Sequence, residues 1–411
     1  MRRTVLLTLV SDWLPKLVAF LAVVLVARKL GASEFAYFAV ALSWMGYAWW
    51  AVDLGQGGYS IRTLAASSGA EQRRLGSEIF SLYLTLAAVV TVGVVALLLV
   101  TGARDVSSGR ILLAMSPYLL TYAVFPDWWL RARGQLWQLG AANWAMVLSL
   151  LVAWALVPSG DAVGYALAYG LAPLAGAVVA VLALERDGTR PVWTPSWTAW
   201  LRHLRTSLMF GAAGLGGQVA VPLALATMTA TSSPRAAGAF ALGMRASGAA
   251  ANALWLLLQN ALPRLLSAQR PITAGIAAGA ALPPLLGVGV AVVLWHPVLE
   301  PVLGASYSGA GAYAALGVLL LAVWGPKYVV EIGLVASFGD AQRIVMNCVA
   351  PVVVVAVVLS GLPTGRSWVM PAALLCGEGL AAVVGYALLR ARRRTVATSC
   401  PAERRTAAAE L

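Results

Sequence analysis

Two long runs without a charged residue decide what this chain can fold into. Residues 79–100 and 162–184 contain no Asp, Glu, Lys or Arg, and each exceeds the about 20 residues that a helix needs to cross a bilayer. Similar apolar runs recur along the 411 residues, of which 60% are hydrophobic and 11% charged, whereas soluble domains are about 25% charged. The sequence therefore predicts an all-α, polytopic membrane protein.

The apolar runs predict twelve transmembrane helices in two six-helix lobes. A weak internal repeat supports the two lobes, because a displacement of 202 residues lays residues 37–42 over 239–244 and Arg62 over Arg264. Such a repeat indicates halves of the same orientation that rock around a central site. The predicted helices lie at about 8–27, 37–58, 77–101, 111–130, 136–157, 161–184, 206–229, 235–261, 272–295, 307–337, 342–362 and 368–389. The predicted parts are an N-terminal lobe (1–184), a linker (185–205), a C-terminal lobe (206–390) and a basic cytoplasmic tail (391–411).

The linker has the pattern of an amphipathic helix. Thr194 suits a helix cap and Pro195 the first helical position. Trp193, Trp197, Trp200 and Leu204 then fall near one helical face. The pattern predicts a helix that lies in the membrane interface, with Arg202, His203 and Arg205 toward the lipid headgroups.

The basic residues predict the orientation of the chain. With both termini in the cytoplasm, 20 of the 29 lysines and arginines fall in inner segments, 6 in outer segments and 3 within spans. The net charge of +13 then lies mainly on the cytoplasmic face, where anionic membrane lipids are its partner. No feature of this charge predicts a nucleic-acid partner.

Residue counts exclude several kinds of catalytic site. With His203 and His296 alone, the chain has no HExxH zinc helix, and none of its few lysines stands in a GxxxxGK[ST] phosphate loop. No metal, cofactor or ATPase site is predicted. Cys348 and Cys376 fall within predicted spans and Cys400 in the tail, so no disulfide is predicted in an outer loop.

Ionisable groups at membrane depth are costly, about 2.5–3.5 kcal/mol each on insertion scales, and usually face water or a partner. Two pairs are spaced four apart, as an ion pair on one helix requires; they are Asp12 with Lys16 and Lys327 with Glu331. Four groups lack such a local partner; they are Asp53, Asp127, Arg245 and Glu378.

Arg245 begins a polar stripe, because Asn252 and Gln259 follow it at intervals of seven residues. Inside a bilayer such a stripe predicts the wall of a hydrated cavity that accepts anions. The alternative is a polar face buried against another helix.

The segment around Asp53 combines a carboxylate with three glycines. Gly55, Gly57 and Gly58 lie between Asp53 and Arg62, at the end of the second predicted span. If the glycines weaken the helix, a hinge forms there while Arg62 holds the interface. Close helix packing through small residues is the alternative interpretation.

Four stretches resemble a known family. The stretches "RKLGASEFAYFAVAL" (28–42), "DLGQGGYSIRTLA" (53–65), "FPDWWLRARGQ" (125–135) and "AAGAFALGMRASG" (236–248) are similar to those of Wzx-type polysaccharide flippases. These belong to the multidrug/oligosaccharidyl-lipid/polysaccharide (MOP) exporter superfamily. Ala36 stands where the family usually has glycine, and the central spans contain few lysines.

The resemblance implies a flippase rather than an enzyme. It would carry undecaprenyl-pyrophosphate-linked oligosaccharide from the inner to the outer leaflet of the bacterial plasma membrane, for surface polysaccharide synthesis. A polysaccharide polymerase and a chain-length regulator would be further partners. The predicted substrate-binding residues are Arg245, Asn252, Gln259, Lys16 and Lys327, and the candidate coupling residues are Asp12, Asp53 and Glu331.

Two other functions stay open from sequence. A MATE-like, ion-coupled drug exporter of the same superfamily would share the twelve helices. A membrane glycosyltransferase, such as an O-antigen polymerase or ligase, also has many spans, but it typically needs a large exterior loop with catalytic residues. Here the longest connection, 185–205, is predicted to be cytoplasmic.

Overall fold

The computed structural model describes residues 10–11, 14–248, 250–251, 300–336 and 340–398. Every regular element in these ranges is a helix. Six helices are long and apolar enough to cross a membrane, by length and composition; they are 69–100, 136–156, 162–186, 311–331, 341–359 and 369–392. The predicted class, an all-α polytopic membrane protein, is confirmed.

The first two predicted spans form one element that is kinked at a glycine. Helix α2 (Leu14–Asp53) has non-helical geometry at Gly31, where φ is 74°. The predicted connection between the spans 8–27 and 37–58 is therefore helical on both sides of Gly31. After α2 the chain turns at Leu54 and Gly55, with φ of 42° and 79°, and α3 (Gln56–Ala65) begins. The prediction of a single helix over 37–58 is therefore wrong at its end.

Two further predicted spans are divided at prolines. Pro117 begins α6 and Pro173 begins α10, each directly after another helix. A proline has no backbone N–H and suits the first turn of a helix, so it divides a span without ending it. The helices of this region are α4 (Gly69–Val100), α5 (Ser107–Met115), α6 (Pro117–Ala123), α7 (Asp127–Ala132), α8 (Leu136–Leu156), α9 (Ala162–Leu171) and α10 (Pro173–Arg186), with the short η2 (Ala103–Asp105).

The second half begins with a long helix that includes part of the predicted linker. Helix α11 (Trp197–Gln218) runs from the linker into the seventh predicted span without a break. The remaining helices are α12 (Ala220–Thr231), the helical residues 234–248, α16 (Glu300–Leu303), η4 (Ala305–Tyr307), α17 (Gly311–Ala336), α18 (Asp340–Leu359) and α19 (Val369–Thr398). The predicted span 272–295 lies outside the described residues.

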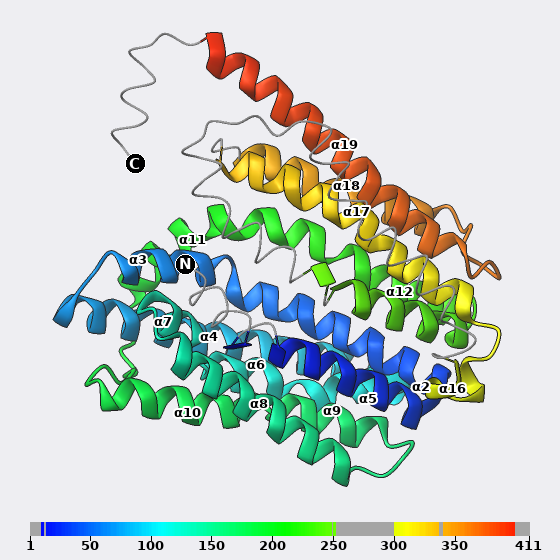
Figure 1. The fold of residues 1–411 in the computed structure, drawn as a ribbon, viewed down its shortest axis with the longest axis horizontal. Helices are drawn as coiled ribbons and strands as arrows, with labels where there is room; N and C mark the ends of the chain where they lie inside the picture. Colours follow the sequence, from blue (N-terminus) through cyan, green and yellow to red (C-terminus); the bar gives the residue numbers. More distant parts are fainter. Residues whose placement is uncertain (1–9, 12–13, 249, 252–299, 337–339, 399–411) are drawn as a thin grey trace.

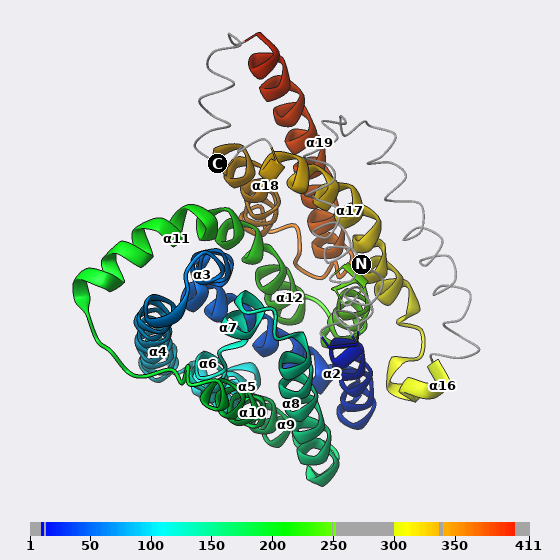
Figure 2. The same ribbon diagram turned by 60° about the vertical axis from the view of Figure 1, so that its left-hand side comes forward.

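The helices gather in two groups (Figures 1 and 2). We name α2–α10 the first bundle, and α12, residues 234–248 and α17–α19 the second bundle. Figure 2 shows α11 passing over α3 and reaching α18, so this helix contacts both bundles. The predicted limits of the lobes, linker and tail stay predictions.

Glycines allow helices to meet at close range, both between the two bundles and within the second bundle. A Cβ on Gly238 would collide with the carbonyl oxygen of Ala32 in α2, and one on Gly243 with that of Ala314 in α17. Small residues at such contacts let helix backbones approach, which is how helices associate where lipid removes the hydrophobic driving force. This packing gives a physical reason for the glycines of the stretch 236–248.

Candidate substrate cavity

A cavity of about 800 Å³ lies between the two bundles. Its described lining includes six acidic or basic side chains; they are Lys16, Arg245, Lys327, Glu331, Arg343 and Glu378. Four are basic and two acidic, so the described wall carries a surplus of positive charge. The volume lies within the about 300–1,000 Å³ typical of ligand sites. The cavity is therefore suited to a sizeable anionic ligand.

Lys327 and Glu331 lie in the cavity wall but do not pair with each other. Lys327 Nζ donates to Glu378 Oε2 at 2.7 Å, and Arg343 donates to Glu331 Oε1 at 3.0 Å. The prediction of a Lys327–Glu331 pair on one helix is therefore wrong, because α17 presents both groups to neighbouring helices. The two pairs tie α17 to α19 and to α18.

Arg245, a predicted substrate-binding residue, lines the same cavity. Its guanidinium donates to Ser43 Oγ at 3.4 Å, and no carboxylate of the described chain forms an ion pair with it. Tyr169, on α9 of the first bundle, lines the same cavity. Arg245 thus joins the positive wall of the second bundle to the first bundle. Asn252, Gln259 and Asp12 lie outside the described residues.

Asp53 lies in a different place, a cavity of about 130 Å³ within the first bundle. Its carboxylate accepts hydrogen bonds from Tyr83 Oη at 2.6 Å, Gly57 N at 2.9 Å and Gly55 N at 3.2 Å. It therefore binds the free N–H groups that begin α3, as a capping residue does. Asp53 supports the break after α2 and does not line the central cavity.

Asp127 lines this smaller cavity too and has a local partner. Arg131, four residues on, donates from Nε to Asp127 Oδ2 at 3.2 Å. The prediction that Asp127 lacks a partner on its own helix is wrong, because α7 (Asp127–Ala132) is a short separate helix whose last turn carries the arginine.

The glycines near Asp53 differ from one another. A Cβ on Gly55 would lie 2.6 Å from the carbonyl oxygen of Ser207 and would collide with Gly211 N, whereas one on Gly58 meets nothing within 4 Å. A Cβ on Gly57 would lie 3.1 Å from Asp53 Oδ1. Gly55 therefore fits both interpretations, since it lies at a break in the helix and at a close packing contact. Its packing partner, Gly211 on α11, was not predicted from the sequence. Arg62 lies in the last turn of α3.

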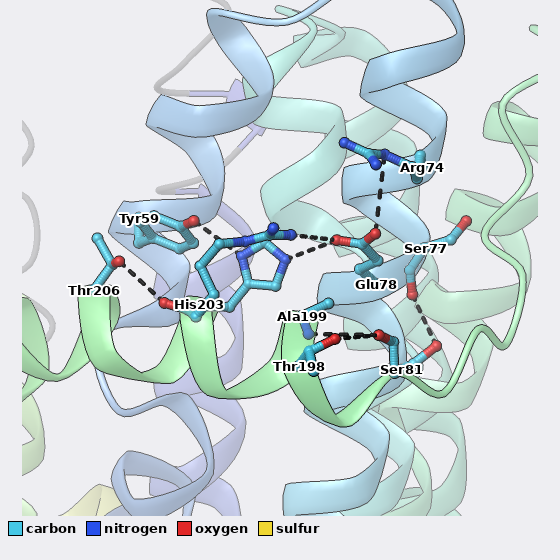
Figure 3. A network of polar contacts seen from close by, with 11 residues as sticks. Tyr59, Arg74, Ser77, Glu78, Ser81, Thr198, Ala199, His203 and Thr206 are labelled. Atoms are coloured by element: carbon cyan, nitrogen blue, oxygen red, sulfur yellow. Dashed lines mark hydrogen bonds and ion pairs between the residues drawn. The ribbon is translucent and has the colours of Figure 1, made fainter.

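A polar cluster near the start of α11 was also not predicted (Figure 3). His203 Nε2 lies 3.1 Å from Glu78 Oε2, and His203 Nδ1 lies 2.9 Å from Tyr59 Oη. Arg202 and Arg74 form ion pairs with the same carboxylate at 3.1 and 3.9 Å. His203 is only 1% exposed, so the prediction that it faces the headgroups is wrong. We name these five residues the His203 cluster.

The His203 cluster joins three helices, α3, α4 and α11 (Figure 3). The connection that precedes α11 is fixed to α4 as well, since Val192 N and Thr194 N donate to Ser77 Oγ and Ser81 Oγ at 3.3 and 2.7 Å. One feature of the sequence could have indicated that His203 is buried. Ala199, His203 and Ser207 are spaced four apart and therefore share one face of α11, and all three are buried.

Comparisons with known proteins agree with this geometry. A family model described as "Polysaccharide biosynthesis protein" matches residues 1–269. No curated protein is significantly similar in sequence. The fold resembles an inward-facing MATE-family multidrug resistance transporter of the MOP superfamily, with a TM-score of 0.71, 14% identity, and 94% of this chain and 96% of that chain covered.

Two further solved structures share the fold. The lipid II flippase MurJ, in an inward closed conformation, gives a TM-score of 0.68 at 10% identity, over 96% of this chain and 88% of that chain. A MOP-superfamily transporter from Pyrococcus furiosus gives 0.53 at 16% identity, over 96% and 99%. These likenesses establish the fold, and the family model covers more than half of the sequence. The chain therefore belongs to the polysaccharide biosynthesis protein family and has the fold of the MOP-superfamily transporters.

Proposed function

We propose that this protein is a flippase for undecaprenyl-pyrophosphate-linked oligosaccharides. It moves them from the inner to the outer leaflet of the bacterial plasma membrane, with both of its termini in the cytoplasm. The observation that carries the proposal is the positively charged cavity of about 800 Å³ between the bundles. Two further findings support the proposal. The chain belongs to a family described as polysaccharide biosynthesis proteins, and it shares its fold with a lipid II flippase.

The cavity meets the physical need of such a substrate. A diphosphate and a sugar chain cannot cross hydrocarbon without losing costly hydration, whereas the lipid tail can stay in the bilayer. Arg245 binds the diphosphate through charge-assisted hydrogen bonds, and Lys16 and Lys327 add positive charge. Rocking of the bundles then exposes the cavity to one side at a time. The chain is more similar to an inward-facing MATE transporter, at a TM-score of 0.71, than to an outward-facing one, at 0.53.

An ion gradient drives the cycle through a carboxylate in this proposal. Glu331 is placed for this role, because it lines the cavity and its partner Arg343 lies on another helix. Asp53 would act from the smaller cavity, through the break after α2. The protein performs no covalent chemistry and works with a polysaccharide polymerase and a chain-length regulator, within a shell of anionic lipids.

A drug exporter is the second candidate, because the fold is also that of MATE transporters. The surplus of basic groups in the described cavity wall disfavours cationic drugs. Efflux of a cationic dye from cells that express the protein would support the exporter. None of these likenesses favours a polymerase or ligase.

The test uses Arg245. We expect Arg245→Ala to reduce translocation of the lipid-linked oligosaccharide at least tenfold, because each charge-assisted bond contributes about 1.5–3 kcal/mol. Arg245→Lys restores activity only in part, since an ammonium lacks the bidentate fork. Translocation in reconstituted vesicles is measured beside the melting temperature. A stable Arg245→Ala protein that transports at the parent rate contradicts the proposal.

A further inference from the structure

The two walls of the central cavity differ in chemistry. The described lining residues from the second bundle include five ionised groups; they are Arg245, Lys327, Glu331, Arg343 and Glu378. From the first bundle, Lys16 is the one ionised group among the described lining residues. Apart from Ser43, the rest of the described first-bundle wall is apolar or aromatic. A ligand that spans the cavity therefore meets charge on one side and neutral groups on the other.

Aromatic rings from three helices form a row in the neutral wall. Tyr169 stacks on Trp154 with ring centroids 6.4 Å apart and an angle of 19°. Tyr118 stacks on Tyr169 at 5.2 Å and 25°, and on Tyr122 at 5.3 Å and 26°. All four residues line the cavity. They come from α8, α9 and α6, so the row fixes these helices in one wall.

Stacking determines what the tyrosines offer to a ligand. The faces of the Tyr118 ring are covered by Tyr122 and Tyr169, so the ring edge, with its hydroxyl group, is left for the cavity. Tyr118 and Tyr169 each contribute a hydroxyl group to this row. A phenolic hydroxyl both donates and accepts, and Tyr122 adds a third to the row. The wall thus presents neutral hydrogen-bonding groups held by a rigid aromatic stack.

Trp50 adds a ring to the same wall. It lies on α2, four residues before the break, and its carbonyl oxygen accepts from Leu54 N at 2.9 Å. It lines the cavity, and the ring contacts among the described residues do not include it. An aromatic face without a stacked partner is a surface for the C–H groups of another molecule.

We propose that Tyr118, Tyr122, Tyr169 and Trp50, here named the tyrosine wall, form the binding subsite for the sugar units nearest the diphosphate. This proposal rests on the proposed function. Uncharged sugars combine hydroxyl groups with apolar C–H faces, and the tyrosine wall offers a partner to each. The diphosphate lies at Arg245, which lines the same cavity as Tyr169. The substrate is therefore oriented across the cavity, with its anion toward the second bundle and its sugar toward the first.

The test compares two probes of equal diphosphate charge, one with a sugar and one without. The methyl ester of farnesyl diphosphate and farnesyl-diphospho-N-acetylglucosamine are titrated into the purified full-length protein, and their dissociation constants are measured by calorimetry. We expect the parent protein to bind the sugar-bearing probe about tenfold more tightly, as a few neutral hydrogen bonds allow. Replacing Tyr118, Tyr122 and Tyr169 together by Phe should reduce this preference to less than about twofold and leave the affinity for the methyl ester unchanged.

Tyr165→Phe is the matched control. Tyr165 is buried in the same aromatic cluster, but its hydroxyl donates to the carbonyl oxygen of Val157 at 3.3 Å and it does not line the cavity. Tyr165→Phe should keep the full sugar preference. Tyr169→Phe alone, the mildest change, should lose part of it, and melting temperatures confirm that the variants are folded.

Each outcome decides between the two proposals. A parent protein without sugar preference, or a folded triple variant that keeps the preference, overturns the sugar subsite and leaves the diphosphate site standing. A parent protein that binds neither probe overturns the proposed function and the sugar subsite together. The proposed orientation is supported if Arg245→Ala loses affinity for both probes, whereas the triple tyrosine variant loses only the preference for the sugar-bearing probe.

Discussion

At the residue scale, His203 shows how a histidine can be fully satisfied while neutral. A carboxylate only accepts hydrogen bonds, so Nε2 carries the proton toward Glu78, and Nδ1 accepts from the Tyr59 hydroxyl. Burial lowers the pKa of the His203 imidazole, and the hydrogen bond that His203 donates to Glu78 offsets only part of this effect. The His203 cluster is therefore arranged for the neutral ring.

This lowered pKa predicts a pH dependence of stability. Between the ordinary histidine pKa of about 6.5 and the lower pKa in the folded protein, the unfolded chain binds more protons, so stability falls as the pH falls. We expect the melting temperature to decrease across this window. His203→Asn should remove this part of the decrease. Arg202→Ala should keep it, because Arg202 forms an exposed pair that contributes about 0–1 kcal/mol.

The buried pair of Lys327 and Glu378 predicts a strongly non-additive effect. Their side chains are 8% and 3% exposed. Lys327→Met alone leaves a buried carboxylate without its counter-ion and should cost about 3–5 kcal/mol, whereas Lys327→Met with Glu378→Leu should cost far less. Thermal unfolding of both single variants and the double variant measures the coupling. Additive losses would show that the two side chains do not depend on each other.

The sequence identified Lys327 and Glu331 as candidate site residues, but it did not reveal the residues with which they form ion pairs. Lys327 and Glu331 were found because charge at membrane depth is costly, but spacing within one helix cannot reveal a partner on another. Their partners Glu378 and Arg343 come from α19 and α18. The cavity was predicted from the stripe that begins at Arg245, whereas the tyrosine wall was missed, since aromatic residues in apolar spans have no distinctive pattern.

At the element scale, the break after α2 rests directly on α11. Gly55 and Gly211 meet backbone to backbone, and a Cβ on Gly211 would collide with the Leu54 carbonyl group. The sequence predicted the twelve-helix pattern because long apolar runs are unambiguous. It could not predict the divisions at Pro117 and Pro173, because apolarity continues across them. Near Gly31 it predicted a connection between spans instead of a kink, whereas a break near Gly55 was one of its two interpretations.

This contact predicts that the three glycines near Asp53 are not equivalent. Gly55→Ala should strongly destabilise the protein, since φ is +79° and the new methyl group would collide with α11. Gly211→Ala should do the same, although its own φ is helical. Gly58→Ala is the control: it meets open space and should be neutral or stabilising by a few tenths of a kcal/mol to about 1 kcal/mol. Melting temperatures order the three variants, and equal effects would contradict the contact.

At the scale of the whole molecule, one end gathers the basic connections. Arg133 binds Thr189 and pairs with Asp187 at 3.5 Å, and Arg73 donates to the carbonyl oxygen of Gly188 at 3.4 Å. The connections after α3, α7 and α10 therefore meet at the same end. The connection between α8 and α9 lies at the opposite end, as Figure 1 shows. The positive-inside rule predicts that the first end faces the cytoplasm.

Cysteine labelling tests this orientation. In a protein whose Cys348, Cys376 and Cys400 are replaced by serine, a membrane-impermeant maleimide added to intact cells should label Ser159→Cys and spare Thr194→Cys. Both positions are exposed in the structure, so accessibility alone does not separate them. Thr194 is preferred to Ser196 because the Ser196 hydroxyl caps α11.

After the membrane is permeabilised, both should react, which shows that the spared cysteine was shielded by the bilayer rather than by the fold. Labelling of Thr194→Cys in intact cells, with Ser159→Cys spared, would reverse the orientation. The proposed transport direction would then have to be reversed as well, because the basic end would face the outer leaflet.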